Sequence, residues 1–440
     1  MRSKKTTLAT ATAISALFLA SPAMAQTEIQ WWHAMGGSLG ELLESITQDF
    51  NESQDDYVVN PVYKGEYNET MTGAIAAFRA GEQPHIVQIY EVGTATMMAA
   101  EGAIRPVYEV MEKSEVEFDP DAYLPAVTGY YTTTEGDMLS LPFNSSTPVM
   151  FYNKDAFEEA GLDPEQPPRT WPEVEEYSQA LLDAGYECGF TTGWPSWVQL
   201  ENFSALHNVP FASKENGFAG TDIEALFNSD LHKHHIGKLA EWQESGVFSY
   251  GGRYSDSQPK FIGGECPIYM DSSASRAGLV SNIEDFEFGV GMLPYWPDVE
   301  DAPQNSIIGG ASLWVLEGHS EEEYEGVAAF FEHLSSPEVQ AEWHQKSGYL
   351  PITEAAFELT EEQGYYDENP GADISVEQMN LNPPTEYSKG LRIGNFVQIR
   401  DIINEELQAT FADDKTAAEA LDEAVERSNS QMDKFHRQNN

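Results

Sequence analysis

The segment TEIQWWHAMGGSLGELLESITQDFNES, residues 27–53, constrains the fold more than any other part of the chain. Glu28 and Ile29 begin a short predicted strand, and Gly36-Gly37 predicts a turn. Apolar residues then recur at the spacing of one helix face, at Leu39, Leu42, Leu43, Ile46 and Phe50. Open α/β sheets present ligands where a strand runs through a glycine turn into a helix N-terminus. We therefore expect an α/β protein with a ligand site near this turn.

Residues 1–25 have the pattern of a secretory signal peptide. Arg2, Lys4 and Lys5 precede an apolar stretch, and Ala23-Met24-Ala25 provides an A-x-A cleavage site. The first cysteine is Cys188, so no lipid anchor is expected next to the cleavage site. The sequence predicts a mature chain that begins near Gln26 and is free in the periplasm, which favours a solute-binding protein over a cytoplasmic enzyme.

The charge of the chain is extreme. Its 440 residues hold 73 acidic and 23 basic side chains, a formal net charge of −50, and the acids are spread along the whole length. This distribution is typical of a halophilic protein that stays soluble in high salt, although an ordinary acidic periplasmic protein is the alternative. Nucleic acids and anionic membranes are expected to be poor partners, because the negative field of the protein repels them. The length is sufficient for two domains, each with its own core.

Two cysteines, Cys188 and Cys266, are present in a chain expected to reach an oxidising compartment. A disulfide and a pair of buried free thiols are both compatible with their spacing. No P-loop, CxxC or HExxH motif is found, and neither a cofactor nor a metal is expected. The run His232-Lys233-His234-His235 could bind a metal, but we interpret it as the solvated surface of a helix.

Strand and helix patterns alternate along the chain, as in α/β folds. Residues 85–90 form a predicted strand that ends at Glu91, and residues 139–143 and 149–152 form two strands with small polar residues between them. Residues 267–270 lead into Asp271-Ser272-Ser273, and residues 307–314 form a strand with a glycine pair. Because no linker separates two domains, we expect the chain to cross between lobes several times.

Arg400 is the most suggestive single charge. It shares one helical stripe with Phe396, Ile403, Leu407 and Phe411, and a buried arginine needs an anionic partner. That partner is either a ligand or one of the many acidic side chains.

Small polar groups and aromatic residues provide further candidates. Ser145, Ser146, Ser272, Ser273 and the amides of Gly309-Gly310 either cradle a phosphate or carboxylate or serve as ordinary turn and cap residues. The aromatic residues at predicted loops either stack on a ligand or pack in the core, and these include Trp31, Trp32, Trp171, Trp194 and Trp197.

Ser38 lies in Gly36-Gly37-Ser38-Leu39-Gly40, which matches the G-x-S-x-G motif of serine hydrolases. The motif begins only about a dozen residues into the mature chain, so the strands that precede it in that hydrolase fold have no residues to form them. We interpret Ser38 as a turn or cap residue and keep a secreted serine hydrolase as an alternative.

Several long segments resemble one family of binding proteins. These segments are residues 75–99, 141–168, 301–315, 341–353 and 390–400. They are similar to the periplasmic glycerol-3-phosphate-binding proteins of Ugp-type ABC importers, within the extracellular solute-binding family that includes maltose-binding protein. The resemblance implies an α/β fold of two lobes with three crossings near Phe143, Met270 and Leu313. Residues 26–143 with 271–313 would form lobe I, and residues 144–270 with 314–440 lobe II.

The resemblance also implies a function and a site. The protein would bind sn-glycerol-3-phosphate or a glycerophosphodiester such as glycerophosphocholine, without catalysis, and deliver it as a monomer to inner-membrane permease subunits. The ligand contacts carried over by similarity are Tyr67, Glu91, Ser146, Trp171, Ser272, Gly310, Tyr349 and Arg400. An oligosaccharide ligand is the alternative that the aromatic residues allow. Asp271 departs from expectation, since an aspartate beside a phosphate would repel it.

Overall fold

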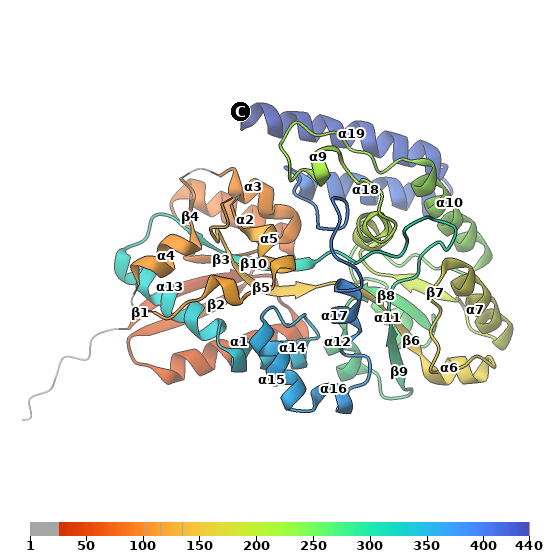
Figure 1. Cartoon of the computed structure of the whole chain (residues 1–440), viewed down its shortest axis with the longest axis horizontal. Helices are drawn as coiled ribbons and strands as arrows, with labels where there is room; N and C mark the ends of the chain where they lie inside the picture. Colours follow the sequence, from red (N-terminus) through yellow and green to blue (C-terminus); the bar gives the residue numbers. More distant parts are fainter. Residues whose placement is uncertain (1–25, 101, 115, 134, 440) are drawn as a thin grey trace, which may run out of the picture.

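The computed structural model describes residues 26–100, 102–114, 116–133 and 135–439. The expected signal peptide lies outside these residues. Two β-sheets lie side by side, each with helices packed against it (Figure 1). The α/β class expected from the sequence is confirmed, and the first predicted strand and helix are β1 (Thr27–His33) and α1 (Gly37–Ser53).

The first sheet has six strands. The parallel strands β1, β2 (Tyr57–Tyr63) and β3 (Ile86–Tyr90) meet β10 (Gly309–Leu316), which runs antiparallel to β3 and also pairs with β4 (Ile104–Arg105) and β5 (Leu141–Ser146). The helices on this side are α1, α2 (Tyr67–Ala80), α3 (Thr94–Met98), α4 (Val107–Lys113), α5 (Pro125–Tyr131), α13 (Glu321–Leu334), α14 (Pro337–Ser347) and α15 (Glu354–Glu362).

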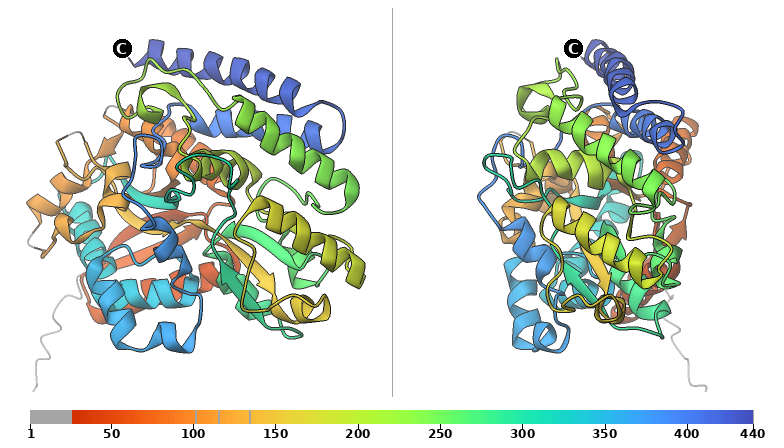
Figure 2. Two further views of the ribbon diagram at one scale, coloured as in Figure 1. Left: turned by 45° about the vertical axis from the view of Figure 1, so that its right-hand side comes forward. Right: turned by 90° about the vertical axis from the view of Figure 1, so that its right-hand side faces the viewer.

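The second sheet has four strands in the order β7 (Phe190–Thr192), β8 (Ile268–Ser272), β6 (Pro148–Asn153) and β9 (Phe288–Gly291). Its helices include α6 (Lys154–Glu159), α7 (Trp171–Ala184), α8 (Phe203–Leu206), α9 (Ser213–Asn216), α10 (Asp230–Ser245), α11 (Gln258–Ile262), α17 (Ile374–Met379), α18 (Phe396–Phe411) and α19 (Ala417–Gln438). The turned views in Figure 2 show α19 along the outside of α18 and α10, against which it packs. Helix α12 (Ser275–Asn282) contacts α1 and α14 of the first half.

The chain passes between the two halves three times within the described residues. The first passage is at Thr147, between β5 and β6, the second between β9 and β10, and the third between α15 and α17. The second and third points differ from the lobe boundaries expected from the sequence. Leu313 lies inside β10 of the first sheet, β9 pairs with β6 of the second, and α13 packs on β1. An apolar run indicates a buried strand but not the sheet that the strand joins.

Cys188 and Cys266 form a disulfide, with Cα atoms 4.9 Å apart. The alternative of two free thiols, which the sequence also allowed, is therefore wrong. The parallel pairing of β7 and β8 brings the cysteines together, because Phe190 pairs with Ile268 and each cysteine lies two residues before its strand partner.

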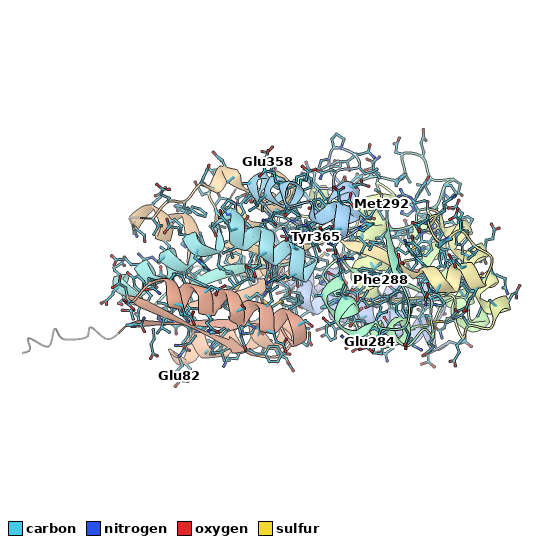
Figure 3. All side chains as sticks on the ribbon, turned by 90° about the horizontal axis from the view of Figure 1, so that it is seen from below. Glu82, Glu284, Phe288, Met292, Glu358 and Tyr365 are labelled. Carbon is cyan, nitrogen blue, oxygen red and sulfur yellow. A yellow bond between two sulfur atoms is a disulfide. The ribbon has the colours of Figure 1, made fainter. Side chains whose placement is uncertain are left out.

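The exterior is strongly acidic, as the composition predicts. Glu82, Glu284 and Glu358 are exposed and lie at the outer edges of the molecule (Figure 3). Within the described ranges, no helix is both long and apolar enough to cross a bilayer.

Candidate functional site

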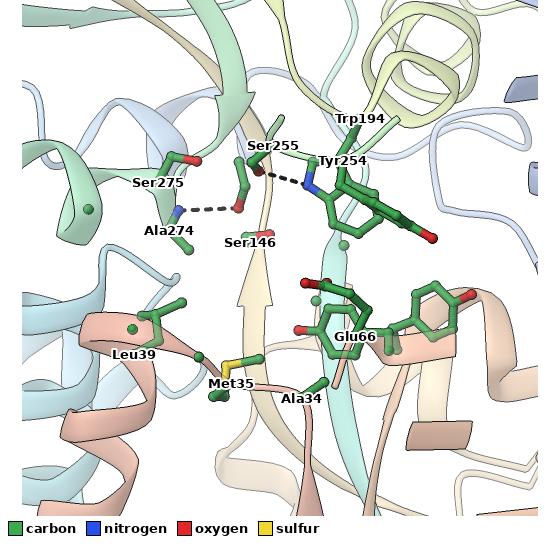
Figure 4. A pocket seen from close by; sticks show the side chains of 18 of the residues that line it. Ala34, Met35, Leu39, Glu66, Ser146, Trp194, Tyr254, Ser255, Ala274 and Ser275 are labelled. Atoms are coloured by element: carbon green, nitrogen blue, oxygen red, sulfur yellow. Dashed lines mark hydrogen bonds between the residues drawn. The ribbon is translucent and has the colours of Figure 1, made fainter. Parts of the chain in front are cut away.

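A cleft of about 530 Å³ lies between the two halves (Figure 4). Seven of the eight site residues expected from the resemblance line it, namely Tyr67, Glu91, Ser146, Ser272, Gly310, Tyr349 and Arg400. The cleft also contains the turn around Gly36-Gly37 at the start of α1, which is where the sequence predicted a ligand site.

Strand ends place the small polar groups of the cleft. Ser146 is the last residue of β5 and pairs with Gly309 at the start of β10. Gly310 has a φ of +91°, and a Cβ atom there would lie 1.8 Å from the carbonyl oxygen of Asn144, so glycine is required. Ser272 ends β8, and its hydroxyl accepts a hydrogen bond from the amide of Ala274 at 3.2 Å. Together with Ser275 at the start of α12, these residues form the neutral cradle of the cleft.

Arg400 of α18 reaches the cleft with its charge already compensated. Its Nε and Nη2 donate to the two carboxylate oxygens of Glu201 at 2.9 and 2.6 Å, and Nη2 also donates to Glu91 at 2.7 Å. We call these three residues the Arg400 triad. All three are at most 8% exposed. Nη1 makes no hydrogen bond to any described residue, which leaves its two N–H groups for a ligand.

Burial and neighbouring charges shift the pKa values of the Arg400 triad in opposite directions. Burial raises the pKa of Glu91, the guanidinium of Arg400 lowers it, and the carboxylate of Glu201 raises it again. Burial alone would lower the pKa of Arg400, but the two carboxylates raise it above its usual value. Among the described residues that line the cleft, Arg400 is the one Lys or Arg, whereas Glu66, Glu91 and Asp256 are acidic.

Aromatic rings form the walls of the cleft. Tyr67 stacks on Tyr90 with ring centroids 5.1 Å apart, and Trp194 meets Tyr254 edge to face at 4.9 Å. Trp194 and Tyr254 lie across the cleft from Ser275 and Leu39 in Figure 4. The backbone of Trp194 has a φ of +43°, a costly conformation for a bulky residue that tends to occur at functional sites. Its indole N–H donates to Ser255 at 3.1 Å.

Trp171 does not line this cleft. It is 3% exposed and packs in an aromatic cluster with His235, Trp242 and Trp296. The helix start predicted at Thr170 is present, since Thr170 caps α7 through a capping box with Glu173. The rings at the cleft are instead Trp194 and Trp197, two of the loop aromatics singled out in the sequence.

Asp271 does not belong to the lining of the cleft, and its side chain is fully buried. It accepts hydrogen bonds from the hydroxyl of Tyr269 and from the amide of Ser272. Burial raises the pKa of Asp271 to about 6, although these hydrogen bonds lower it.

Ser38 lines the cleft, but its recorded hydrogen bond is to the hydroxyl of Ser281 at 3.5 Å. None of the described residues that line the cleft is a histidine or lysine, the residue types that commonly activate a serine nucleophile.

Several histidines outside the cleft pack or form hydrogen bonds within the fold. In α10, the expectation of a solvated histidine surface is wrong for His232 and His235, which are buried and form hydrogen bonds with Ser204 and Gln199.

One cluster has the composition of a possible metal site. His85, His319 and Glu323 bring possible ligand atoms within 4.8 Å of one another. The two imidazole rings, however, stack at 3.9 Å, so their in-plane lone pairs do not converge. The Gln30 amide also donates to Nδ1 of His85 at 3.0 Å, which leaves the proton on Nε2.

The fold and the cleft define a ligand-binding protein with two α/β halves. The family model described as bacterial extracellular solute-binding protein matches residues 45–372. The sn-glycerol-3-phosphate-binding periplasmic protein UgpB of Salmonella paratyphi A is 53% identical over 94% of each chain, and that of Escherichia coli O6:K15:H31 is 51% identical over 96% of each. The chain belongs to the bacterial extracellular solute-binding protein family, as the sequence resemblance indicated. Members of this family are non-enzymatic transport components, which argues against the hydrolase alternative.

Solved structures agree on the fold. The crystal structure of UgpB from Mycobacterium tuberculosis in complex with glycerophosphocholine superposes with a TM-score of 0.77, covering 93% of this chain and 99% of that chain at 20% identity. Maltose-bound T. maritima MalE3 superposes with a TM-score of 0.76, covering 91% of this chain and 99% of that chain at 17% identity. At these identities the comparisons establish the two-sheet binding-protein fold.

Proposed function

We propose that the protein is the periplasmic binding component of an ABC importer and captures sn-glycerol-3-phosphate. Relatives that are 51–53% identical carry this ligand in their names and are periplasmic. The observation that carries the proposal is the division of the cleft into a neutral cradle and the Arg400 triad. The ligand has the same two parts, a phosphate and a pair of hydroxyl groups. The closed protein would deliver its ligand as a monomer to permease subunits in the inner membrane.

The phosphate sits on the neutral cradle in this proposal. Ser146, Ser272 and the Gly310 amide supply hydrogen bonds without charge, and α12 directs its N-terminus toward the same place. The Arg400 triad suits a phosphate poorly, because two carboxylates surround the guanidinium. It suits hydroxyl groups well, since Glu91 accepts and Nη1 of Arg400 donates. Tyr67, Tyr349 and Trp194 then enclose the carbon skeleton.

A glycerophosphodiester with a quaternary ammonium group, such as glycerophosphocholine, is a second candidate. Trp194 and Tyr254 form an aromatic corner, and Glu66 and Asp256 line the same cleft. Burial raises the pKa of Glu66, with Glu69 and Asp256 raising it further. An aromatic corner with acidic neighbours favours a quaternary ammonium ion.

Calorimetric titration of the protein without its signal peptide tests both candidates. The buffer should hold about 1 M salt, because at that ionic strength the Debye length is about 3 Å and the acidic surface no longer repels an anion. We expect saturable binding of sn-glycerol-3-phosphate and none of maltose. Binding of maltose in place of both phosphate esters would overturn the proposal in favour of an oligosaccharide ligand.

A further inference from the structure

Glu201 lies behind the cleft rather than in its lining. It comes from η3 (Trp197–Asn202), a π-helical turn whose first residue, Trp197, faces the cleft. Such turns are rare and are frequent at functional sites. The Glu201 side chain is 2% exposed, and both of its oxygens bond Arg400. Nothing in the sequence singled out this residue.

The two carboxylates of the Arg400 triad differ in what holds them. Glu201 forms a two-point contact with Nε and Nη2, which fixes the plane of the guanidinium. Glu91 forms a single bond to Nη2 and lines the cleft, so it can turn toward a ligand without releasing Arg400 from Glu201. Arg400 therefore keeps its orientation and a compensating charge when a ligand binds.

The Arg400 triad has more negative than positive charge. One guanidinium faces two carboxylates, and the other described residues that line the cleft include no Lys or Arg. A phosphate placed at Nη1 would feel both carboxylates through a poorly screened interior, whereas a hydroxyl group would not. The charge of Glu201 therefore favours a hydroxyl over an anion at this end of the cleft.

We propose that Glu201 is a positioning residue that determines specificity. It orients Arg400 and neutralises its charge, so that this end of the cleft binds hydroxyl groups and disfavours phosphate. The inference rests on the proposed function and adds a prediction that glycerol-3-phosphate binding alone does not make. Inorganic phosphate, which has no glycerol hydroxyls, should bind wild-type protein far more weakly than sn-glycerol-3-phosphate. Removal of the Glu201 charge should admit phosphate to Arg400.

The test compares the dissociation constants of sn-glycerol-3-phosphate and inorganic phosphate by calorimetry in high salt. In Glu201→Gln, the ratio of the phosphate Kd to the ester Kd should fall about tenfold, chiefly through tighter phosphate binding. Glu406→Gln is the matched control, since Glu406 is a buried glutamate of α18 that bonds Lys415 and Arg427 outside the cleft. An unchanged ratio in Glu201→Gln, or an equal fall in the control, would overturn the inference.

Two further variants separate orientation from charge. Glu201→Asp keeps the charge but is too short for the two-point contact, so the ester Kd should rise about fivefold while the phosphate Kd stays constant. An unchanged ester Kd in this variant contradicts the positioning role, even if Glu201→Gln fails to fold.

The double variant tests whether Glu201 acts through Arg400. In an Arg400→Gln background, Glu201→Gln should change neither the ester Kd nor the phosphate Kd further. Failure of wild-type protein to bind the ester is a separate result, which would overturn the proposed function.

Discussion

Arg400 and Glu91 are 309 positions apart in the sequence and meet through a hydrogen bond of 2.7 Å. Glu91 begins η1 (Glu91–Gly93) directly after β3 of the first sheet, whereas Arg400 lies in α18, which packs on α10 and α19. The contact therefore joins the two halves of the molecule within the lining of the cleft. A ligand that bonds Glu91 and Arg400 together also bonds both halves, which couples binding to their relative position.

Loss of the Arg400 side chain should weaken binding of sn-glycerol-3-phosphate. Arg400→Gln removes a charge-assisted donor and leaves Glu91 and Glu201 without their shared cation, so we expect affinity to fall about tenfold or more in calorimetry. Arg427→Gln is the control, since Arg427 bonds Glu405 and Glu406 outside the cleft. Equal affinities of wild type and Arg400→Gln would contradict a role for the Arg400 triad.

Loss of the Ser146 hydroxyl should affect every ligand that carries a phosphate. Ser146→Ala removes a donor of the neutral cradle, and a hydrogen bond to a charged group contributes about 1.5–3 kcal/mol. We expect sn-glycerol-3-phosphate and inorganic phosphate to lose affinity by the same factor, about tenfold or more. Ser430→Ala on the exposed face of α19 provides the comparison. A loss confined to the ester would place the phosphate elsewhere.

The buried carboxyl group of Asp271 should make stability depend on pH. Its pKa is raised to about 6 by burial, so the folded state holds the proton more tightly than the unfolded state. This contribution is complete below the unfolded pKa and is lost as the pH rises through about 6. Asp271→Asn should therefore be more stable than wild type by about 2–3 kcal/mol at about pH 7.5, and by less than about 1 kcal/mol at about pH 4.

Urea unfolding at the two pH values measures this difference, with Asp433→Asn on the surface of α19 as the control. A stability gain of Asp271→Asn that is the same at both pH values would show that packing, rather than protonation, is responsible.

The disulfide should stabilise the fold without affecting the cleft. Cys188 and Cys266 close a loop with a sequence separation of 78, and neither residue lines the cleft. The double variant Cys188→Ala/Cys266→Ala should lose about 2–4 kcal/mol in the free energy of unfolding, because the unfolded chain is no longer constrained. The Kd for sn-glycerol-3-phosphate should stay the same. A large loss of affinity would show that the disulfide holds η3 and the Arg400 triad in place.

The sequence predicts much of this site because short motifs lie at strand ends. The strand before Glu91, the serines that end β5 and β8, and the glycine pair of β10 are local patterns. Antiparallel pairing of β3 and β5 with β10, and of β6 with β8, brings them to one cleft. The sequence also indicates Arg400, because a charged residue on an apolar helical stripe needs a partner.

The features of the site and fold that the sequence does not predict depend on long-range contacts, which no local sequence pattern encodes. Trp171 begins a well-capped helix, but its ring turns toward Trp242 in the core rather than to the cleft. Glu201 lies 199 positions from Arg400 and resembles any of the other acidic residues in this chain. The sheet to which β9 and β10 belong depends on long-range pairing, which explains why the expected lobe boundaries differ from the observed sheets.

A crystal structure of the complex with sn-glycerol-3-phosphate tests the division of the cleft most directly, through the position of the phosphorus atom. We predict that the phosphate oxygens accept hydrogen bonds from Ser146, Ser272 and the Gly310 amide, while the glycerol hydroxyls contact Glu91 and Nη1 of Arg400. A phosphate bound to the Arg400 guanidinium, with the hydroxyls on the serines, would contradict the account.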